Sequence, residues 1–325
     1  MGLEGEFMSL IWQSVMTSRR QFLIIAALGV IPFPPMGMQE AAPAQRTTEL
    51  GAQKHEPPQE TTEPTQEAKP AQETSNRLIV INPGHYKHSG ENLGAYVPGI
   101  GHEYIINTQI SRALHKKLQD IGLHAIITRD EQNYLPEIVE FMADHKTRLE
   151  AEYDAYINVT NYRRHRELGR REAILQLGIM RYSEARGAAA MINIHVDDQL
   201  GKRRRRRAEA KGFSVILNKT ASAESERLQR EICSALRRTL PLNRSCRIAS
   251  ARSGIFILGN TELRFSVPSC LVECGFMKQQ YVIGVNTKHI CDPEVQDIYA
   301  ASLARGMAND FGILVAEGGI SPVSP

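Results

Sequence analysis

The 325-residue chain is predicted to form a single α/β domain with a mostly parallel central sheet flanked by helices and an extra helical insertion. Two observations support this fold class. Short apolar runs rich in Ile and Val stop at turn residues, which is typical of buried strands. Between these runs lie segments whose apolar residues recur at helical spacing. Alternation of strands with helices favours a parallel sheet covered by helices.

The composition excludes several classes of protein. With 42% hydrophobic and 23% charged residues, the chain can bury one substantial core. The formal net charge of +3 is too small to indicate a nucleic-acid partner, and we expect none. The five cysteines are an odd number and cannot all pair within one chain, so no disulfide framework is assumed.

Residues 1–44 resemble a twin-arginine export signal. Arg19 and Arg20 precede the apolar run Ile24–Ile31, and Ala42-Pro43-Ala44 provides small residues for cleavage. The apolar run is too short to span a bilayer, which needs about 20 residues. We therefore expect export to the periplasm or cell envelope, with no stable membrane span after signal removal. An uncleaved signal that acts as an anchor is the alternative.

Residues 45–76 are predicted to be a disordered linker. This segment is rich in Pro, Glu, Gln and Thr and lacks clusters of aromatic or β-branched apolar residues. Such a composition cannot bury enough apolar surface to offset the entropy lost on ordering. The folded domain is expected at 77–314, because the strand and helix patterns begin after the linker, and 315–325 is interpreted as a tail.

The first strand of the domain leads to a histidine. The apolar run Leu78–Ile81 is stopped by Asn82-Pro83-Gly84, so His85 lies just past the end of a predicted strand. In open α/β sheets ligands bind outside the carboxyl ends of the strands, which makes His85 a candidate for chemistry. A lone histidine in a loop is more often solvated or structural, but two further stretches end in the same way.

A helix and a second strand follow. Apolar residues recur at helical spacing from Ile106 to Ile121, and Gly122 stands where a helix C-terminal glycine belongs. Glu103 is predicted just before the first turn of this helix. Leu123–Thr128 is the second predicted strand. Arg129 after it is interpreted as half of a surface ion pair rather than as a carboxylate-binding residue.

The segment 133–182 is predicted to be a helical insertion. Its apolar residues indicate two amphipathic helices, joined by the basic link Tyr162–Arg166. The first helix is carried by Ile138, Val139, Met142, Leu149 and Tyr153, and the second by Leu168, Ile174, Leu175 and Leu177. The insertion either caps a cleft or receives a regulator, or it is a helical elaboration of the scaffold.

A second histidine ends another predicted strand, Ala188–His195, and Val196-Asp197-Asp198 follows it. The six cations Lys202–Arg207 are interpreted as a solvated loop or, alternatively, as a contact for an anionic polymer of the cell envelope. The remaining predicted elements are a strand at 213–217, a helix at 228–240 stopped by Pro241, strands at 255–258 and 267–276, and a closing helix at 295–311.

Four side chains from distant stretches suit a hydrolytic metal site: His85, Glu103, His195 and Glu273. The two histidines and Glu273 lie at predicted strand ends. Two imidazoles and one carboxylate are the ligands of catalytic zinc sites that keep a fourth position for water, and zinc lowers the pKa of such a water to about 7. A second, uncoordinated carboxylate would take the proton of the water and pass it to a leaving amine.

Four motifs resemble, in order, those of the zinc-dependent N-acetylmuramoyl-L-alanine amidases of the cell-division type, bacterial enzymes of peptidoglycan cleavage. They are Ile81–His85, Gly101–Glu103, Ile192–Asp197 and Pro268–Phe276, of which the last is the most specific. The resemblance covers about residues 77–312. It implies a single α/β catalytic domain that hydrolyses the amide between N-acetylmuramic acid and L-alanine, in cell-wall remodelling or daughter-cell separation.

The resemblance also implies roles for the four side chains. His85, Glu103 and His195 would bind one Zn²⁺ per chain, and Glu273 would be the catalytic glutamate. Peptidoglycan is the implied substrate, and a possible activator protein would act on the 133–182 insertion. Some relatives of this type carry an inserted helix that blocks the zinc site until a partner displaces it, but that insertion follows the second histidine.

The sequence departs from the family pattern close to these residues. Asn82 stands where the family usually has Asp, and Tyr104 replaces the lysine that commonly follows the glutamate. Both departures concern the support of the ligands, because a carboxylate near a metal histidine sets its tautomer and basicity. His88 and His102 flank the site and would replace a ligand if the motifs were aligned differently, and His102 could also contact substrate.

Cys270 and Cys274 lie on the same predicted strand as Glu273 but should point to its other face. Buried thiols are therefore expected rather than a cysteine nucleophile. Two other functions stay open. One is a non-hydrolytic peptidoglycan-binding or regulatory protein on the same fold, and the other is a zinc peptidase that acts on stem peptides.

Overall fold

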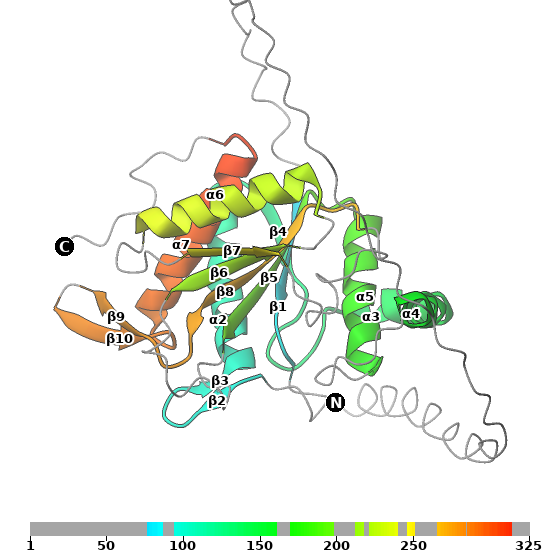
Figure 1. Ribbon diagram of the computed structural model, residues 1–325, viewed down its shortest axis with the longest axis horizontal. Coiled ribbons are helices and arrows are strands. Elements are labelled where there is room, and N and C mark those ends of the chain that lie inside the picture. Colours follow the sequence, from blue (N-terminus) through cyan, green and yellow to red (C-terminus); the bar gives the residue numbers. More distant parts are fainter. Residues whose placement is uncertain are drawn as a thin grey trace, which may run out of the picture. The chain divides into compact units, whose positions relative to one another are not determined.

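Six strands form the central sheet of the computed structural model (Figure 1). The structure describes residues 77–86, 94–160, 170–197, 212–217, 221–239, 246–250, 265–283 and 285–313. The strands are β1 (Leu78–Pro83), β4 (His124–Ile127), β5 (Ala190–Asp197), β6 (Phe213–Leu217), β7 (Cys246–Ser250) and β8 (Ser269–Phe276). Their order across the sheet is β4-β1-β5-β8-β6-β7.

The sheet is mostly parallel, as predicted. Strands β4, β1, β5 and β8 run in the same direction. Strand β6 is antiparallel to β8, and β7 runs parallel to β6. The carboxyl ends of β1 and β5 therefore meet at the same edge of the sheet, which is the edge where the sequence places His85 and His195.

Successive residues of β1 face two different cores. Ile79 and Ile81 belong to the larger core, whereas Leu78 and Val80 belong to the smaller one on the other face. All four side chains are buried. Burial on both faces explains why this strand is a continuous apolar run rather than an alternation of apolar and polar residues.

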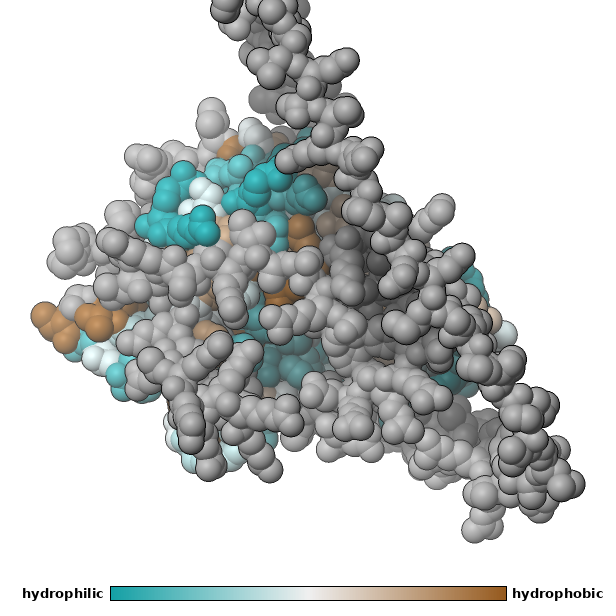
Figure 2. All heavy atoms as spheres, viewed as in Figure 1, coloured by the Kyte–Doolittle hydropathy of each residue, from teal (hydrophilic) through white to brown (hydrophobic). Residues whose placement is uncertain are grey.

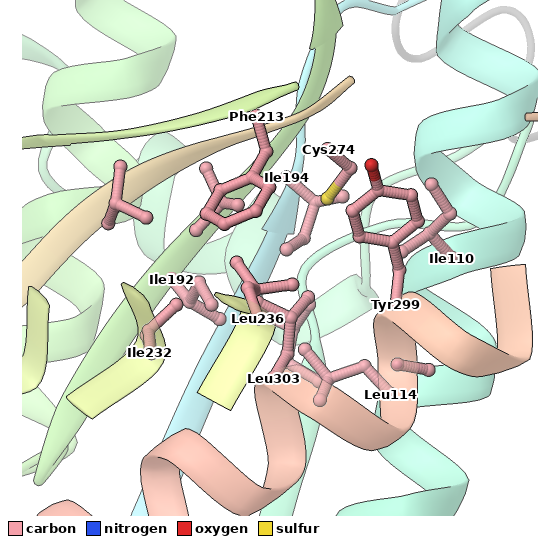
Figure 3. Close-up of a cluster of buried hydrophobic side chains, with 14 of the residues drawn as sticks. Ile110, Leu114, Ile192, Ile194, Phe213, Ile232, Leu236, Cys274, Tyr299 and Leu303 are labelled. Carbon is pink, nitrogen blue, oxygen red and sulfur yellow. The ribbon is translucent and has the colours of Figure 1, made fainter. Parts of the chain in front are cut away.

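The larger core lies between the sheet and three helices, α2 (Glu103–Asp120), α6 (Ala223–Thr239) and α7 (Pro293–Asp310). Figure 3 shows how side chains of these helices meet the sheet. Its labelled members are Ile110 and Leu114 of α2, Ile232 and Leu236 of α6, Tyr299 and Leu303 of α7, and Ile192, Ile194, Phe213 and Cys274 of the strands.

The helical insertion builds the smaller core. Its helices are α3 (Pro136–Asp144), α4 (Lys146–Thr160) and α5 (Arg170–Ala185), which Figure 1 shows on the side of the sheet away from α6 and α7. Ile138 of α3 and Ile179 of α5 pack with the smaller core. Helix α4 packs against α3 and α5. Helices α3 and α5 are thus part of the scaffold that covers the sheet.

Two hairpins extend from the domain. One consists of β2 (Tyr96–Val97) and β3 (Gly101–His102), and it leads directly into α2. The other consists of β9 (Gln280–Ile283) and β10 (Asn286–His289). Figure 2 shows apolar atoms at the end of the second hairpin, where Val282 and Val285 are exposed, and hydrophilic atoms over α6.

Two predicted boundaries near the candidate site are wrong by a few residues. Helix α2 begins at Glu103, so this residue lies inside the first turn rather than before it. Strand β5 continues past His195 to Asp197, which still pairs with Phe276 of β8 beyond a β-bulge. The histidine and the glutamate therefore lie near the carboxyl ends of their strands but not at the last residue.

Other predicted elements differ more. The predicted helix that carries Ile138 and Tyr153 is two helices, because α3 ends at Asp144 and α4 begins at Lys146. Strand β7 was not predicted. Several predictions lie outside the described residues: the export signal 1–44, the linker 45–76, the link Tyr162–Arg166, the cations Lys202–Arg207, the strand 255–258 and the tail 315–325.

Candidate metal centre

Three side chains from separate segments converge at the carboxyl edge of β1 and β5: His85, Glu103 and His195. One possible ligand atom of each lies within 4.8 Å of the other two. His85 Nε2 lies 3.2 Å and His195 Nδ1 lies 3.4 Å from the same atom, Glu103 Oε1. The two imidazole rings are nearly perpendicular, with centroids 5.0 Å apart. The structure brings together all three residues that the resemblance implies as ligands.

Pairing of β1 with β5 places the two histidines side by side. Pro83 pairs in register with Ile194, and the backbone N–H of Gly84 donates to Ile194 O at 2.7 Å. His195 follows Ile194 in β5, and His85 lies two residues beyond the end of the neighbouring parallel strand β1. Gly84 lies against the imidazole of His195, and the space between them leaves no room for a side chain at position 84.

Glu103 is held by backbone and side-chain donors. The backbone N–H of Ala95 donates to Oε2 at 2.9 Å, and the backbone N–H of Val196 donates to Oε1 at 3.3 Å. Asn107, one turn further along α2, donates from Nδ2 to Oε1 at 3.3 Å. The N-terminal end of a helix also favours a negative charge. The carboxylate is therefore fixed in orientation from three directions.

The electrostatics keep Glu103 and His195 in the forms that bind metal. Burial alone would raise the pKa of Glu103, but hydrogen bonds from His195 and His85 outweigh it and hold that pKa well below its usual range. Burial lowers the pKa of His195 against the opposing hydrogen bond to Glu103. A deprotonated carboxylate and neutral imidazoles are the ligand forms that metal binding requires.

Glu273 lies beside this group without belonging to it. It pairs in register with His195 across β5 and β8, and residues paired in this way point to the same face of a sheet. Its Oε2 atom is buried and has no hydrogen-bond partner among the described residues. Burial raises the pKa of Glu273 well above its usual value, and the negative charges of Glu103 and Asp197 add to this effect. Such a carboxyl is suited to accept and release a proton.

The donor set fits a catalytic zinc ion. Two histidine nitrogens and one carboxylate oxygen are a known ligand set of zinc hydrolases, which leave a coordination position for water or substrate. Among the described residues, this is the one group of His, Cys, Asp and Glu side chains close enough to hold a metal. Glu273, whose Oε2 is buried and unpartnered, is a second carboxylate beside this donor set.

Sequence reasoning missed two residues that shape the site, Asn107 and Gly94. Besides Glu103, Asn107 Nδ2 donates to Gly84 O at 3.0 Å, so one buried amide links two of the segments that carry ligands. Gly94 lies against Glu103 and His85, where a Cβ would come within 2.5 Å of Glu103 Oε2. A polar residue one turn after Glu103 was the available signal for Asn107, because positions four apart share a helix face.

The prediction of a surface ion pair for Arg129 is wrong. The side chain is 1% exposed, and it donates to the backbone carbonyls of Pro83 and Gly84. Burial lowers the pKa of its guanidinium. The physical reason is topological: β4 lies beside β1 in the sheet, so Arg129 emerges directly under the turn that follows β1.

Asn82, the departure closest to His85, ties several elements together. Its Nδ2 donates to Asn193 Oδ1 at 2.8 Å and to Gln176 Oε1 at 3.1 Å, and its Oδ1 accepts from Thr128 at 2.8 Å. These bonds join β1 to β5, to α5 and to the end of β4. Asn82 therefore supports the frame of the site through an amide network that uses both its donors and its acceptor.

His102 and His88 are the other histidines predicted to flank the site, and Cys270 and Cys274 are the cysteines predicted on the strand of Glu273. His102 precedes Glu103, and its ring stacks near that of Tyr96, with centroids 4.6 Å apart. His88 lies outside the described residues. Cys270 and Cys274 are free, buried thiols in the larger core. They thus lie on the face of β8 opposite Glu273, as predicted.

The chain was compared with protein families, with curated proteins and with solved structures. The sequence profile described as N-acetylmuramoyl-L-alanine amidase matches residues 79–309. No curated protein matches the chain. Among solved structures, it is similar to the N-acetylmuramoyl-L-alanine amidase AmiC2 of Nostoc punctiforme, with 19% identity and a TM-score of 0.46 over 73% of this chain and 97% of that chain.

Two further solved structures are similar to the chain. One is the CwlD amidase from Clostridioides difficile in complex with the GerS lipoprotein, with 17% identity and a TM-score of 0.49 over 73% of this chain and 99% of that chain. The other is the catalytic domain of CwlV from Bacillus (Paenibacillus) polymyxa var. colistinus, with 15% identity and a TM-score of 0.47 over 73% and 99%.

Proposed function

Because the chain belongs to the N-acetylmuramoyl-L-alanine amidase family, we propose that it hydrolyses the amide between N-acetylmuramic acid and L-alanine in peptidoglycan with one Zn²⁺. His85, Glu103 and His195 would hold the ion. The observation that carries this proposal is the convergence of their ligand atoms within 4.8 Å of one another. All three residues lie inside the segment that matches the family.

In the proposed hydrolysis, the metal site and Glu273 would have different roles. Bound zinc polarises a carbonyl oxygen and makes water acidic enough to react at neutral pH. Glu273 would accept the proton of the attacking water at Oε2 and deliver it to the nitrogen of the departing L-alanine. Support for this role comes from the raised pKa of Glu273 and from its buried, unpartnered Oε2.

Digestion of purified peptidoglycan tests the proposed reaction and separates it from both alternatives. An amidase releases stem peptides that begin with a new L-alanine N-terminus and leaves glycan strands with free muramic acid carboxyl groups. A stem-peptide peptidase would leave L-alanine attached to muramic acid. A non-hydrolytic binding protein would sediment with peptidoglycan and release nothing. Activity should disappear with a chelator and return with Zn²⁺.

We propose that the protein works outside the cytosol, where its substrate lies. The arginine pair Arg19-Arg20 supports twin-arginine export, and Cys233 is disulfide-bonded, a state that persists in oxidising compartments. In the described part of the chain, no helix has the length and apolar character needed to cross a membrane. Replacing both arginines with lysine should leave the protein in the cytosolic fraction.

A role in daughter-cell separation is the biological part of the proposal. An amidase that cuts stem peptides from glycan strands removes the cross-links that hold two new cell walls together. Cells that lack the protein should form unseparated chains, and the Glu273→Gln variant should fail to restore separation. Restoration by that variant would place the role in binding rather than in hydrolysis.

We propose that helix α4 is the part of the 133–182 insertion that a regulator of the site contacts. Helices α3 and α5 contribute to the core under the sheet, so deleting the whole of 133–182 would remove part of the scaffold. Helix α4 packs on α3 and α5, and none of its described side chains belongs to the two cores that cover the sheet. Replacing Lys146–Thr160 with a short linker should abolish the response to a regulator while basal activity remains. An unchanged response would exclude α4 as the contact.

A further inference from the structure

We infer that Arg129 is a positioning residue that fixes the backbone turn carrying His85 and thereby sets the affinity of the metal centre. The inference rests on the proposed function, because it concerns how one proposed ligand is held. It adds a role that the four motifs do not contain, since Arg129 lies outside all of them and follows β4, a strand that supplies no ligand.

The guanidinium of Arg129 donates to three consecutive carbonyl groups of the turn. Nε donates to Pro83 O at 3.2 Å, Nη2 donates to Gly84 O at 2.8 Å, and Nη2 also bonds His85 O. Three carbonyls that point toward one spot repel one another. A planar cation with several N–H donors in a fixed arrangement is suited to hold them there.

The other edge of the guanidinium is anchored to the scaffold. Nη1 donates to Thr108 Oγ1 at 3.0 Å and to the backbone oxygen of Asp130 at 2.9 Å. Thr108 lies on α2, the helix that begins with Glu103. The side chain of Arg129 therefore joins the His85 turn to the helix that carries the second proposed ligand.

The turn needs such support because His85 has an unusual backbone conformation. Its φ of 60° makes it the one non-glycine residue with positive φ among those the structure describes. A residue other than glycine rarely adopts a positive φ, so surrounding contacts must hold His85 in this conformation. The hydrogen bonds from Arg129 fix the carbonyl groups of Pro83 and Gly84, which lead into this conformation, and of His85, which adopts it.

A ring closes the open side of the guanidinium. Arg129 Cζ lies 5.7 Å from the centroid of the Tyr86 ring, within the range of a cation–π contact. Tyr86 OH in turn donates to Gln132 O at 2.6 Å. The residue immediately after His85 is thus fixed as well, and the charge of Arg129 is shielded from solvent rather than offered to substrate.

Arg129→Lys tests the inference, because lysine keeps the charge but presents its donors from a single point. Zinc affinity would be measured by competition with a chromophoric chelator, and the melting temperature on the metal-free protein. We expect zinc affinity to fall about 10- to 100-fold, the usual effect of removing an outer partner of a ligand. The absorption spectrum of the Co²⁺-substituted protein should change, because His85 is displaced.

Arg181→Lys is the matched control. Arg181 is a partly buried arginine of α5 that bonds Glu152 and Glu184 within the helical insertion. This substitution should lower the melting temperature without changing zinc affinity or the Co²⁺ spectrum. If Arg129→Lys behaves in the same way as this control, Arg129 is only a structural residue and the inference is overturned.

Thr108→Val decides the question if Arg129→Lys does not fold. It removes one of the two acceptors of Nη1, the side-chain one, without touching the turn, and a fall of a few-fold in zinc affinity would support the inference. Unchanged affinity would overturn it. A wild-type protein that binds no zinc would overturn the proposed function itself, whereas normal wild-type binding with unaffected variants would overturn only the role of Arg129.

Discussion

Gly84 lies directly against the imidazole of His195. A Cβ atom at position 84 would come within 2.1 Å of His195 Cε1 and 2.2 Å of His195 Nε2. Gly84 is not among the glycines with positive φ, so an alanine would suit its backbone but not its surroundings. The glycine is therefore required by the proposed metal centre rather than by the turn.

Gly84→Ala should weaken zinc binding about 10-fold or more, because the His195 imidazole must move away from the added methyl group. Competition with a chelator would measure the effect. Gly187→Ala is the control, since Gly187 has a φ of 61° and a Cβ atom added there would meet nothing within 4 Å. That substitution costs about 1–2 kcal/mol of backbone strain but should leave zinc affinity unchanged. Equal affinities in both variants would contradict the packing argument.

Glu273→Gln should retain zinc and lose hydrolysis. The amide is nearly isosteric with the carboxylate but cannot accept and release a proton near neutral pH, and general acid–base catalysis contributes about 10²- to 10⁴-fold in rate. Zinc content and peptidoglycan hydrolysis would be measured on the same preparation. Cys274→Ala, which changes the next residue on the other face of β8, should keep both properties. Loss of zinc in Glu273→Gln would instead make Glu273 a ligand.

The stability of the metal-free protein should depend on pH through Glu273. Its pKa is raised in the folded state, so its contribution to stability is present below the unfolded pKa and is lost as pH rises. Glu273→Gln should therefore raise the melting temperature at about pH 8, with a difference that shrinks toward about pH 4. Each pKa unit corresponds to about 1.4 kcal/mol. If Glu273→Gln had a lower melting temperature than wild type at about pH 8, the burial of an uncompensated carboxyl would be contradicted.

Much of the fold could be predicted because its central strands are buried on both faces. The runs at Leu78–Ile81 and Ala188–His195 are continuous and apolar, and turn residues mark the end of the first. Strand β7 lacks such a run, since Cys246–Ser250 mixes polar and apolar residues at the edge of the sheet. The break between α3 and α4 at His145 could not be predicted, because no glycine or proline marks it in the sequence.

The part of the candidate site that the sequence pattern could predict is the set of residues at or near strand ends. His85, His195 and Glu273 follow or end apolar runs, and a parallel sheet brings such positions to one edge. Asn107 and Arg129 act by donating to backbone carbonyls of a distant turn. Their partners become neighbours only when α2 and β4 pack beside β1, and local sequence does not contain that pairing.

Zinc content of the purified full chain is the most direct test of the proposed metal centre. Wild type would be measured beside His195→Ala and beside His124→Ala, which changes an exposed histidine of β4. We expect about one zinc ion per chain in wild type and His124→Ala and almost none in His195→Ala. Absence of zinc from the wild-type chain, or its retention in His195→Ala, would contradict a metal centre formed by His85, Glu103 and His195.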